Sequence, residues 1–156
     1  MTREEALKFL RENIKKENIL KHMLATEAIM RALAQKFGEN EDDWGLAGLL
    51  HDCDMEIVDW QKNPEKQGMV AADMLDKMGV DKVVTDAIRA HNELTGKARE
   101  TLIEKAIFCA DPISGLIVAA ALVLPSKKLA DLTAESVLNR FKEKSFAAKV
   151  NREAIN

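Results

Sequence analysis

The sequence predicts an all-helical protein, and three observations lead to this fold class. Ala, Leu, Met and Lys are plentiful, whereas Tyr is absent and Trp and Phe are few. This composition favours helices, because strands draw on β-branched and aromatic residues. Apolar residues recur at helical spacing along most of the chain, and capping signals stand where helices would begin. We therefore expect a single compact bundle of about six to eight helices.

Three helices are expected in the first third of the chain. Thr2 and Glu5 form a capping box ahead of the first helix. A second helix is expected from about residue 18 to Gly38, which suits the position just after a helix. A third helix runs from about residue 42 to 51, after an acidic cluster that suits a helix start.

Two more helices are expected in the middle of the chain, after an irregular stretch over 53–63. Pro64 suits the first position of a helix that ends at Gly79. Asp81 is expected to cap the next helix, which reaches His91. A loop with a glycine follows over 92–99.

The last part of the chain is expected to contain two long apolar segments and a final helix. Thr101 opens a capping box, and its helix meets Pro112, where we expect it to be interrupted. A further helical segment continues to Leu124. The last substantial helix is expected over about 133–146.

Composition and charge restrict the domain organisation and the possible partners. No repeat or long linker divides the chain, so one domain is expected over 1–156, with its core in about 18–125. The formal net charge of −3 argues against nucleic-acid binding. The run 115–124 is too short to span a bilayer and predicts a buried helix; with no signal peptide visible, we expect a cytoplasmic protein. Cys53 and Cys109 do not form a disulfide framework.

The chain has only three histidines, and helical spacing places each on the inward face of its helix. His22 lies at the edge of an apolar arc, and His91 aligns with apolar residues. His51 aligns with two small residues that leave room for an approaching group. A single inward histidine is usually a core residue with a satisfied hydrogen bond, but three of three favour a shared function.

Two aspartates strengthen the hypothesis of a metal site. Asp52 follows His51 at the end of an apolar run, where an uncompensated carboxylate is costly to bury. Asp111 shares a helix face with apolar residues; alternatively, it caps a helix that starts at Pro112. A divalent cation explains all of these positions at once. Imidazole nitrogen with carboxylate oxygen suits Mn, Fe, Ni, Co or Zn.

These residues resemble a known family. His22, the pair His51-Asp52 and the distant Asp111 resemble the H…HD…D pattern of the HD superfamily of metal-dependent phosphohydrolases, in particular its small stand-alone members. The resemblance covers about residues 18–125. It implies an all-helical fold, a metal bound by these four residues, and hydrolysis of a phosphate ester.

The sequence also departs from that family's pattern. Relatives often continue the pair as HDIG, whereas here Cys and Asp follow it. Two-metal relatives carry another histidine between the pair and the position of His91. Gln67 stands about where that histidine is expected, so we predict one metal ion with His91 outside its coordination sphere.

A phosphohydrolase also needs a proton acceptor and groups that bind phosphate. Asp54 is the candidate general base and Glu56 the second candidate; alternatively, both belong to a solvated acidic loop. His91 is expected to donate to the substrate phosphate, and Asn92 to orient it. Four basic residues either contact phosphate or are simply solvated: Lys62, Lys66, Arg89 and Lys97. The two cysteines neighbour proposed ligands, but a buried reduced cysteine is far commoner than a thiolate ligand.

The sequence thus predicts a metal-dependent phosphohydrolase of a small phosphorylated metabolite or nucleotide, either a phosphomonoester or a phosphodiester. The expected cofactor is one divalent transition metal ion, and no membrane or nucleic-acid partner is evident. The alternative is a domain that retains a metal and binds a ligand or partner without turnover. The pattern does not predict the oligomeric state.

Overall fold

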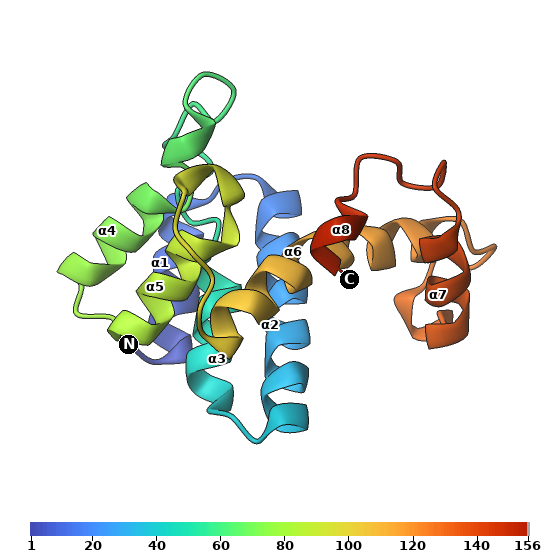
Figure 1. The fold of residues 1–156 in the computed structure, drawn as a ribbon, viewed down its shortest axis with the longest axis horizontal. Coiled ribbons are helices and arrows are strands. Elements are labelled where there is room, and N and C mark those ends of the chain that lie inside the picture. Colours follow the sequence, from blue (N-terminus) through green and yellow to red (C-terminus); the bar gives the residue numbers. More distant parts are fainter. Residues whose placement is uncertain (156) are drawn as a thin grey trace.

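The computed structural model describes residues 1–155, and within that range it contains eight α-helices and no strand (Figure 1). The all-helical prediction is therefore confirmed. The helices are α1 (Arg3–Asn13), α2 (Glu17–Phe37), α3 (Glu41–Leu50), α4 (Met69–Lys77), α5 (Lys82–His91), α6 (Leu102–Leu122), α7 (Ala134–Lys142) and α8 (Arg152–Ile155). Helices α1 to α6 form the main body, and α7 lies on an arm beside it (Figure 1).

Most of the predicted capping signals are present in the structure, but the side chain of Asp81 makes no capping hydrogen bond at the start of α5. The Thr2 and Glu5 capping box starts α1, and Thr101 with Glu104 forms a second one at the start of α6. Gly38 ends α2 in the left-handed conformation with φ of 72°, which glycine adopts at little cost. These local signals set where the long helices begin and end.

Helix α2 packs most extensively against α3, and a glycine permits their close approach. A Cβ atom on Gly48 would lie 2.8 Å from the carbonyl oxygen of Thr26 and 2.9 Å from the backbone of Glu27. Those atoms belong to the backbone of α2 and cannot rotate away. Gly48 therefore allows α3 to lie directly against α2, one turn before the HD pair.

The core lies between these helices and is made of aliphatic side chains, methionines and one tryptophan. Its largest fully buried residues include Leu10, Met23, Met30, Leu49 and Ile88. Burying such side chains is worth roughly 1.5–3 kcal/mol each, so this core supplies most of the force that holds the helices together.

The segment between α3 and α5 differs in detail from the prediction. Residues 53–63 form turns, as expected. Pro64 does start a helix, but this is the short 3₁₀ helix η1 (Pro64–Lys66), and α4 begins only at Met69. Gly68, with φ of 84°, separates the two because the chain turns there in a conformation that favours glycine.

Helix α6 corrects the prediction that a helix is interrupted at Pro112. It runs through Pro112 as one helix of 21 residues, and Asp111 lies inside it rather than at the start of a new helix. A proline inside a helix removes one backbone hydrogen bond, so the local signal favoured a break. Packing against α2, α3 and α5 keeps the helix continuous.

The same helix changes the prediction about the apolar run over 115–124. That run belongs to α6, which by length and composition alone is apolar enough to cross a membrane. Of its most apolar window, 39% is buried inside the structure. Within the run, Leu116, Ala120 and Ala121 are buried but Val118, Leu122 and Val123 are exposed, so the predicted burial of this segment is correct only in part. Its buried residues Ala110, Ser114 and Leu116 face the other helices of the body.

The C-terminal residues form an arm that leaves the body and returns to it. Helix α7 packs on α6, and it ends at Lys142 rather than near residue 146 as predicted. Arg152 donates hydrogen bonds to the carbonyl oxygens of Phe141, Glu143 and Phe146, which holds the returning segment against α7. The short helix α8 then packs on α6 (Figure 1).

Candidate metal centre

Three helices bring the predicted metal ligands to one place, and a fourth adds His91 beside them. His22 lies in the second turn of α2, and His51 and Asp52 directly follow α3. Asp111 lies in the middle of α6, and His91 ends α5. The cluster therefore joins residues that are up to 89 positions apart in the sequence.

The Nε2 atoms of His22 and His51 lie within 4 Å of each other, and each also lies within 4 Å of a carboxylate oxygen of Asp52 and of Asp111. The Nε2 atom of His22 is 3.1 Å from that of His51, 3.1 Å from an oxygen of Asp111 and 3.5 Å from an oxygen of Asp52. The Nε2 atom of His51 is 3.4 Å from Asp52 and 3.9 Å from Asp111. Two nitrogens and two carboxylate oxygens thus surround a single point.

Hydrogen bonds on the far side of each ring determine which nitrogen faces the cluster with a lone pair. His51 Nδ1 lies 2.8 Å from the carbonyl oxygen of Gly48, which can only accept, so Nδ1 carries the proton. Ser114 Oγ donates to the carbonyl oxygen of Asp111 and so accepts from His22 Nδ1 at 2.9 Å. In the neutral rings both Nε2 lone pairs therefore face the carboxylates, as in metal-binding histidines.

His91 follows the same arrangement, but its ring has a different neighbour. Its Nδ1 atom donates to the carbonyl oxygen of Ile88, so its Nε2 atom is also an acceptor. The side-chain nitrogen of Gln67 lies 3.0 Å from His91 Nε2 and donates to an oxygen of Asp52 as well. The Gln67 amide thus bridges His91 and Asp52 on the side of the cluster away from His22.

Burial and charge oppose each other in this cluster. Burial alone would lower the pKa of His51, but the carboxylates of Asp52 and Asp111 raise it to about 9. Burial would raise the pKa of Asp52, yet His51 holds it well below its ordinary value. Burial likewise would raise the pKa of Asp111, but its contact with His22 and the charge of His51 keep it lowered. The carboxylates are ionised, and a positive charge at the centre stabilises them.

The donor set fits a divalent transition metal ion. The ligand atoms of His22, His51 and Asp52 lie within 4.8 Å of one another, and so do those of His51, His91 and Asp111. Imidazole nitrogens with carboxylate oxygens suit Mn, Fe, Ni, Co or Zn. The group can therefore hold a metal ion, and it also leaves His91 within reach of the same centre.

A pocket of about 440 Å³ opens above the cluster. Asp52, Gln67, His91 and Asp111 lie in its wall, so the predicted site is accessible from solvent. The other lining residues come from the turns after α3, from η1, from the short 3₁₀ helix η2 (Glu93–Thr95), from α6 and from the C-terminal segment. The pocket is of the size that small-molecule sites have.

Asp54, the predicted general base, lies away from the residues that line this pocket. Its side chain is fully buried, and its Oδ2 atom accepts hydrogen bonds from the backbone nitrogens of Gly68 and Ala71 at 2.9 and 2.8 Å. Its Oδ1 atom has no partner among the described residues, and burial raises the pKa of the carboxyl group. These contacts fasten the start of α4 beneath the cluster.

Glu56 and Asn92 also have partners within the protein. The Glu56 carboxylate accepts from the backbone nitrogens of Lys15 and Lys16, at the start of α2. The Asn92 side chain lines the pocket, but it donates to the carbonyl oxygens of Pro64 and Gln67. Asn92 therefore holds the segment that carries Gln67, and its predicted contact with substrate remains a prediction.

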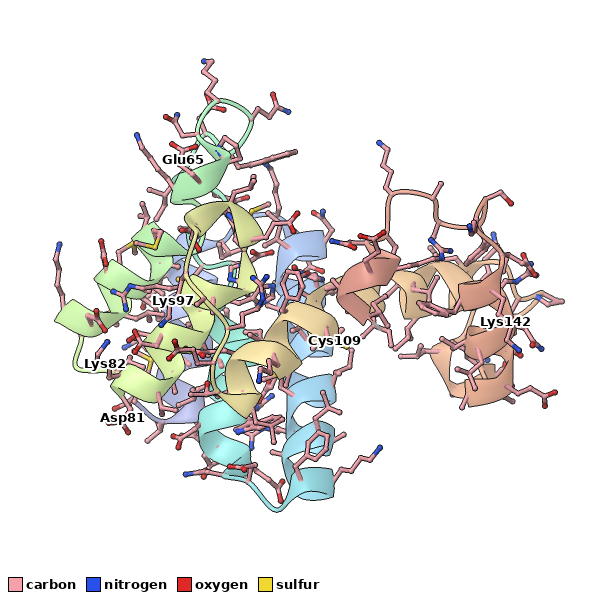
Figure 2. The ribbon with its side chains drawn as sticks, in the orientation of Figure 1. Glu65, Asp81, Lys82, Lys97, Cys109 and Lys142 are labelled. Carbon is pink, nitrogen blue, oxygen red and sulfur yellow. The ribbon has the colours of Figure 1, made fainter. Side chains whose placement is uncertain are left out.

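The cysteines lie beside the cluster without joining it. Cys53 is fully buried, and burial raises the pKa of its thiol, so the group is a neutral core residue. Cys109 lies where α6 meets α8 (Figure 2), with its sulfur 3.6 Å from the carbonyl oxygen of Ile155. In the described part of the chain, neither belongs to the candidate metal-binding groups.

Two residues of the site were not identified from the sequence. Ser114 orients His22, and it lies three residues after Asp111, where a helix brings side chains to one face. The carbonyl oxygen of Gly48 orients His51 across one helical turn. The spacing of Ser114 was a usable signal, whereas the role of a backbone carbonyl has no signature in the sequence.

Fold and site together define an all-helical protein with a histidine and aspartate cluster that can hold a metal ion. A family model described as HD domain matches residues 19–116, most of the body and all four predicted ligands. The chain belongs to the HD domain family. The resemblance noted in its sequence is thereby confirmed.

One curated relative illustrates how far the similarity extends. Ribonuclease Y of Mesoplasma florum is 32% identical over 98 residues, which are 63% of this chain and 19% of that protein. The chain thus corresponds to less than a fifth of that relative. No solved structure matches the chain.

Proposed function

We propose that this protein is a metal-dependent phosphohydrolase that acts on a small phosphorylated metabolite or nucleotide. One observation carries the proposal: His22 and His51 each have Nδ1 engaged elsewhere and present Nε2 to Asp52 and Asp111 beside a pocket. Membership of the HD domain family supports hydrolysis, because the family is one of metal-dependent hydrolases.

In this proposal His22, His51, Asp52 and Asp111 hold one divalent cation. When bound, such a cation lowers the pKa of a coordinated water and neutralises negative charge on a phosphoryl group. The chain itself keeps the rings oriented through Ser114 and the carbonyl of Gly48.

His91 and Gln67 are the polar residues proposed to meet the phosphate. Both line the pocket next to Asp52, and both offer nitrogen atoms to a bound ester. The Gln67 amide nitrogen contacts Asp52 and His91, so it would exchange one of these contacts for a hydrogen bond to a phosphate oxygen. A protonated His91 would donate a charge-assisted hydrogen bond to a phosphate oxygen.

A second candidate function is binding without turnover. It is favoured by the position of Asp54, the predicted general base, which is not among the residues that line the pocket and accepts a hydrogen bond from the backbone nitrogen of Gly68. In that case the domain retains a metal and recognises a ligand or partner.

The similarity to Ribonuclease Y also makes RNA a substrate to include in any assay of hydrolysis.

The experiment is release of nitrophenol from an aryl phosphate, with the protein loaded with Mn, Ni or Zn and compared with the chelated protein. We expect turnover only with metal, and loss of turnover in Asp111→Ala. Asp131→Ala is the matched control, since Asp131 is exposed on the arm, outside the pocket wall. No metal-dependent release from aryl phosphate, nucleotide or RNA would reject hydrolysis and favour the second candidate.

A further inference from the structure

The pocket beside the histidine and aspartate cluster has an apolar wall. Trp60 and Met55 come from the turns after the HD pair, Leu94 from η2 and Phe108 from α6, and all of them line the pocket. Trp60 is 48% exposed and Leu94 is 56% exposed, so both side chains are accessible to a ligand in the pocket. Such a wall suits a flat, uncharged body of a ligand.

The Phe108 ring is held in place within this wall. The guanidinium carbon of Arg99 lies 3.8 Å from the ring centroid, and Arg99 also donates to the carbonyl oxygen of Ala90. One face of the ring is thus covered, and the position of Arg99 is fixed by two partners. Arg99 supports the aromatic wall rather than binding an anion in the pocket.

The described residues that line the pocket include no lysine and no arginine. Three of the four basic residues considered from the sequence have acidic partners elsewhere: Arg89 pairs with Asp73 and Asp76, and Lys62 pairs with Asp59. Lys97, labelled in Figure 2, pairs with Glu104 at the start of α6. The fourth, Lys66, is exposed on η1 and is not among the residues that line the pocket. Phosphate groups beyond the first would therefore find no cationic side chain in the wall.

The charge balance of the site also disfavours a ligand with more than one phosphate. The carboxylates of Asp52 and Asp111 balance the two charges of a divalent cation, so the loaded centre is close to neutral. Glu93 adds another carboxylate at the pocket wall, on η2. A ligand with two or three phosphates would bring additional negative charges next to Glu93, and like charges repel in a partly enclosed site.

We infer that the ligand of this pocket carries a single phosphate on a flat, uncharged body, as in a nucleoside monophosphate, and that polyphosphates are rejected. The inference rests on the proposed function for the position of the phosphate at the metal centre. Trp60 and Phe108 contact the flat body, and Glu93 sets the limit on charge.

The test measures binding and phosphate release separately, on the metal-loaded protein. Calorimetry compares AMP, ADP and ATP, which share a body and differ in phosphate number, and ribose 5-phosphate, which lacks the base. We expect AMP to bind about tenfold or more tightly than each of the others, given the usual strength of base stacking on aromatic residues.

Two variants test which residues of the pocket wall cause the preference for AMP, and a third variant is their control. Trp60→Ala should reduce the difference in binding affinity between AMP and ribose 5-phosphate. Glu93→Lys should reduce the difference in binding affinity between ATP and AMP. The matched control is Glu12→Lys, because Glu12 is exposed on α1, away from the pocket wall, and undergoes the same change of charge.

The outcomes separate this inference from the proposed function. ATP bound as tightly as AMP, or no binding of AMP, would overturn the inference, and phosphate release from any ester would still support the hydrolase. Selective binding of AMP without release of phosphate would support the inference and reject hydrolysis of that ester.

Discussion

The Nε2 atoms of His22 and His51 lie 3.1 Å apart, at hydrogen-bond distance, so either one of them carries a proton or a cation lies beside both. Each ring is fixed from behind, by Ser114 and by the carbonyl oxygen of Gly48. The same rings face two ionised carboxylates. The group where α2, α3 and α6 meet can therefore hold a cation.

Gly48 links the packing of the bundle to this site, and a methyl group there should disturb both. In Gly48→Ala the new Cβ atom would lie within 3 Å of the α2 backbone, so α2 and α3 must separate. Overpacking of this kind costs about 1–3 kcal/mol of unfolding free energy. We also expect weaker metal binding, because His22 and His51 stand on the two helices that separate.

Gly115→Ala is the control for that variant. Gly115 lies inside α6, where a Cβ atom would meet only Val150 at an ordinary 3.9 Å. Alanine is favoured over glycine in a helix by about 1 kcal/mol, so this variant should be as stable as the wild type or more so. Denaturant unfolding of both variants makes the measurement, and equal stability of the two would contradict the role of Gly48.

Local signals predicted the helix ends well, because a capping box or a helix-ending glycine acts over a few residues. Thr2, Gly38 and Thr101 mark their helices as expected. The predicted interruption at Pro112 was wrong for the same reason, because it rested on a local signal. Its local preference to interrupt a helix is overridden by the packing of α6 against three other helices, which no short window of sequence contains.

The candidate site could be predicted in part. The residue types and spacing of His22, His51 and Asp52 indicated a metal centre, and the structure brings them together. The direction of the Asp54 side chain could not be predicted, since it depends on where the start of α4 lies. Its neighbours Gly68 and Ala71 are 14 and 17 residues away in the sequence.

Asp54→Asn tests whether Asp54 is a base or an anchor. An asparagine oxygen can still accept from the backbone nitrogens of Gly68 and Ala71, so as an anchor it should leave turnover within a few-fold of the wild type. As a general base its loss should lower turnover by roughly 10²- to 10⁴-fold with metal content unchanged. The contacts favour the anchor, and a large loss of rate in the metal-loaded variant would contradict it.

We predict that Gln67 limits the site to one metal ion, because its amide contacts the acceptor atoms of His91 and Asp52 that a second ion would need. We expect about one equivalent of Mn or Ni in the wild type and in His91→Ala. Gln67→His replaces the donor with a ligand and should admit a second ion beside Asp52 and His91. Gln67→Ala adds no ligand and should stay at one, and two equivalents in the wild type would refute this account.

Glu104 should make the stability of α6 depend on pH. Burial would raise the pKa of its carboxyl group, but hydrogen bonds from the backbone nitrogens of Thr101 and Glu100 lower it from 4.5. A lowered pKa in the folded state adds stability above pH 4.5, and that stability is lost as the pH falls through the folded pKa.

Glu104→Gln should therefore destabilise the protein at neutral pH, by about 0.5–2 kcal/mol as for other helix caps, and much less near pH 3. Glu100→Gln is the control, because the Glu100 side chain is exposed and lies outside the capping box. Thermal unfolding at a series of pH values makes the comparison. A difference between Glu104→Gln and wild type that stays constant down to pH 3 would count against this role.

The most direct test of the metal centre is the metal content of the purified protein after exposure to Mn, Ni or Zn and dialysis, measured by elemental analysis. The account predicts about one equivalent in the wild type and almost none in His51→Ala, because that variant removes a fully buried ligand from the middle of the cluster. A wild-type protein that retains no metal, or a His51→Ala protein that retains a full equivalent, would contradict it.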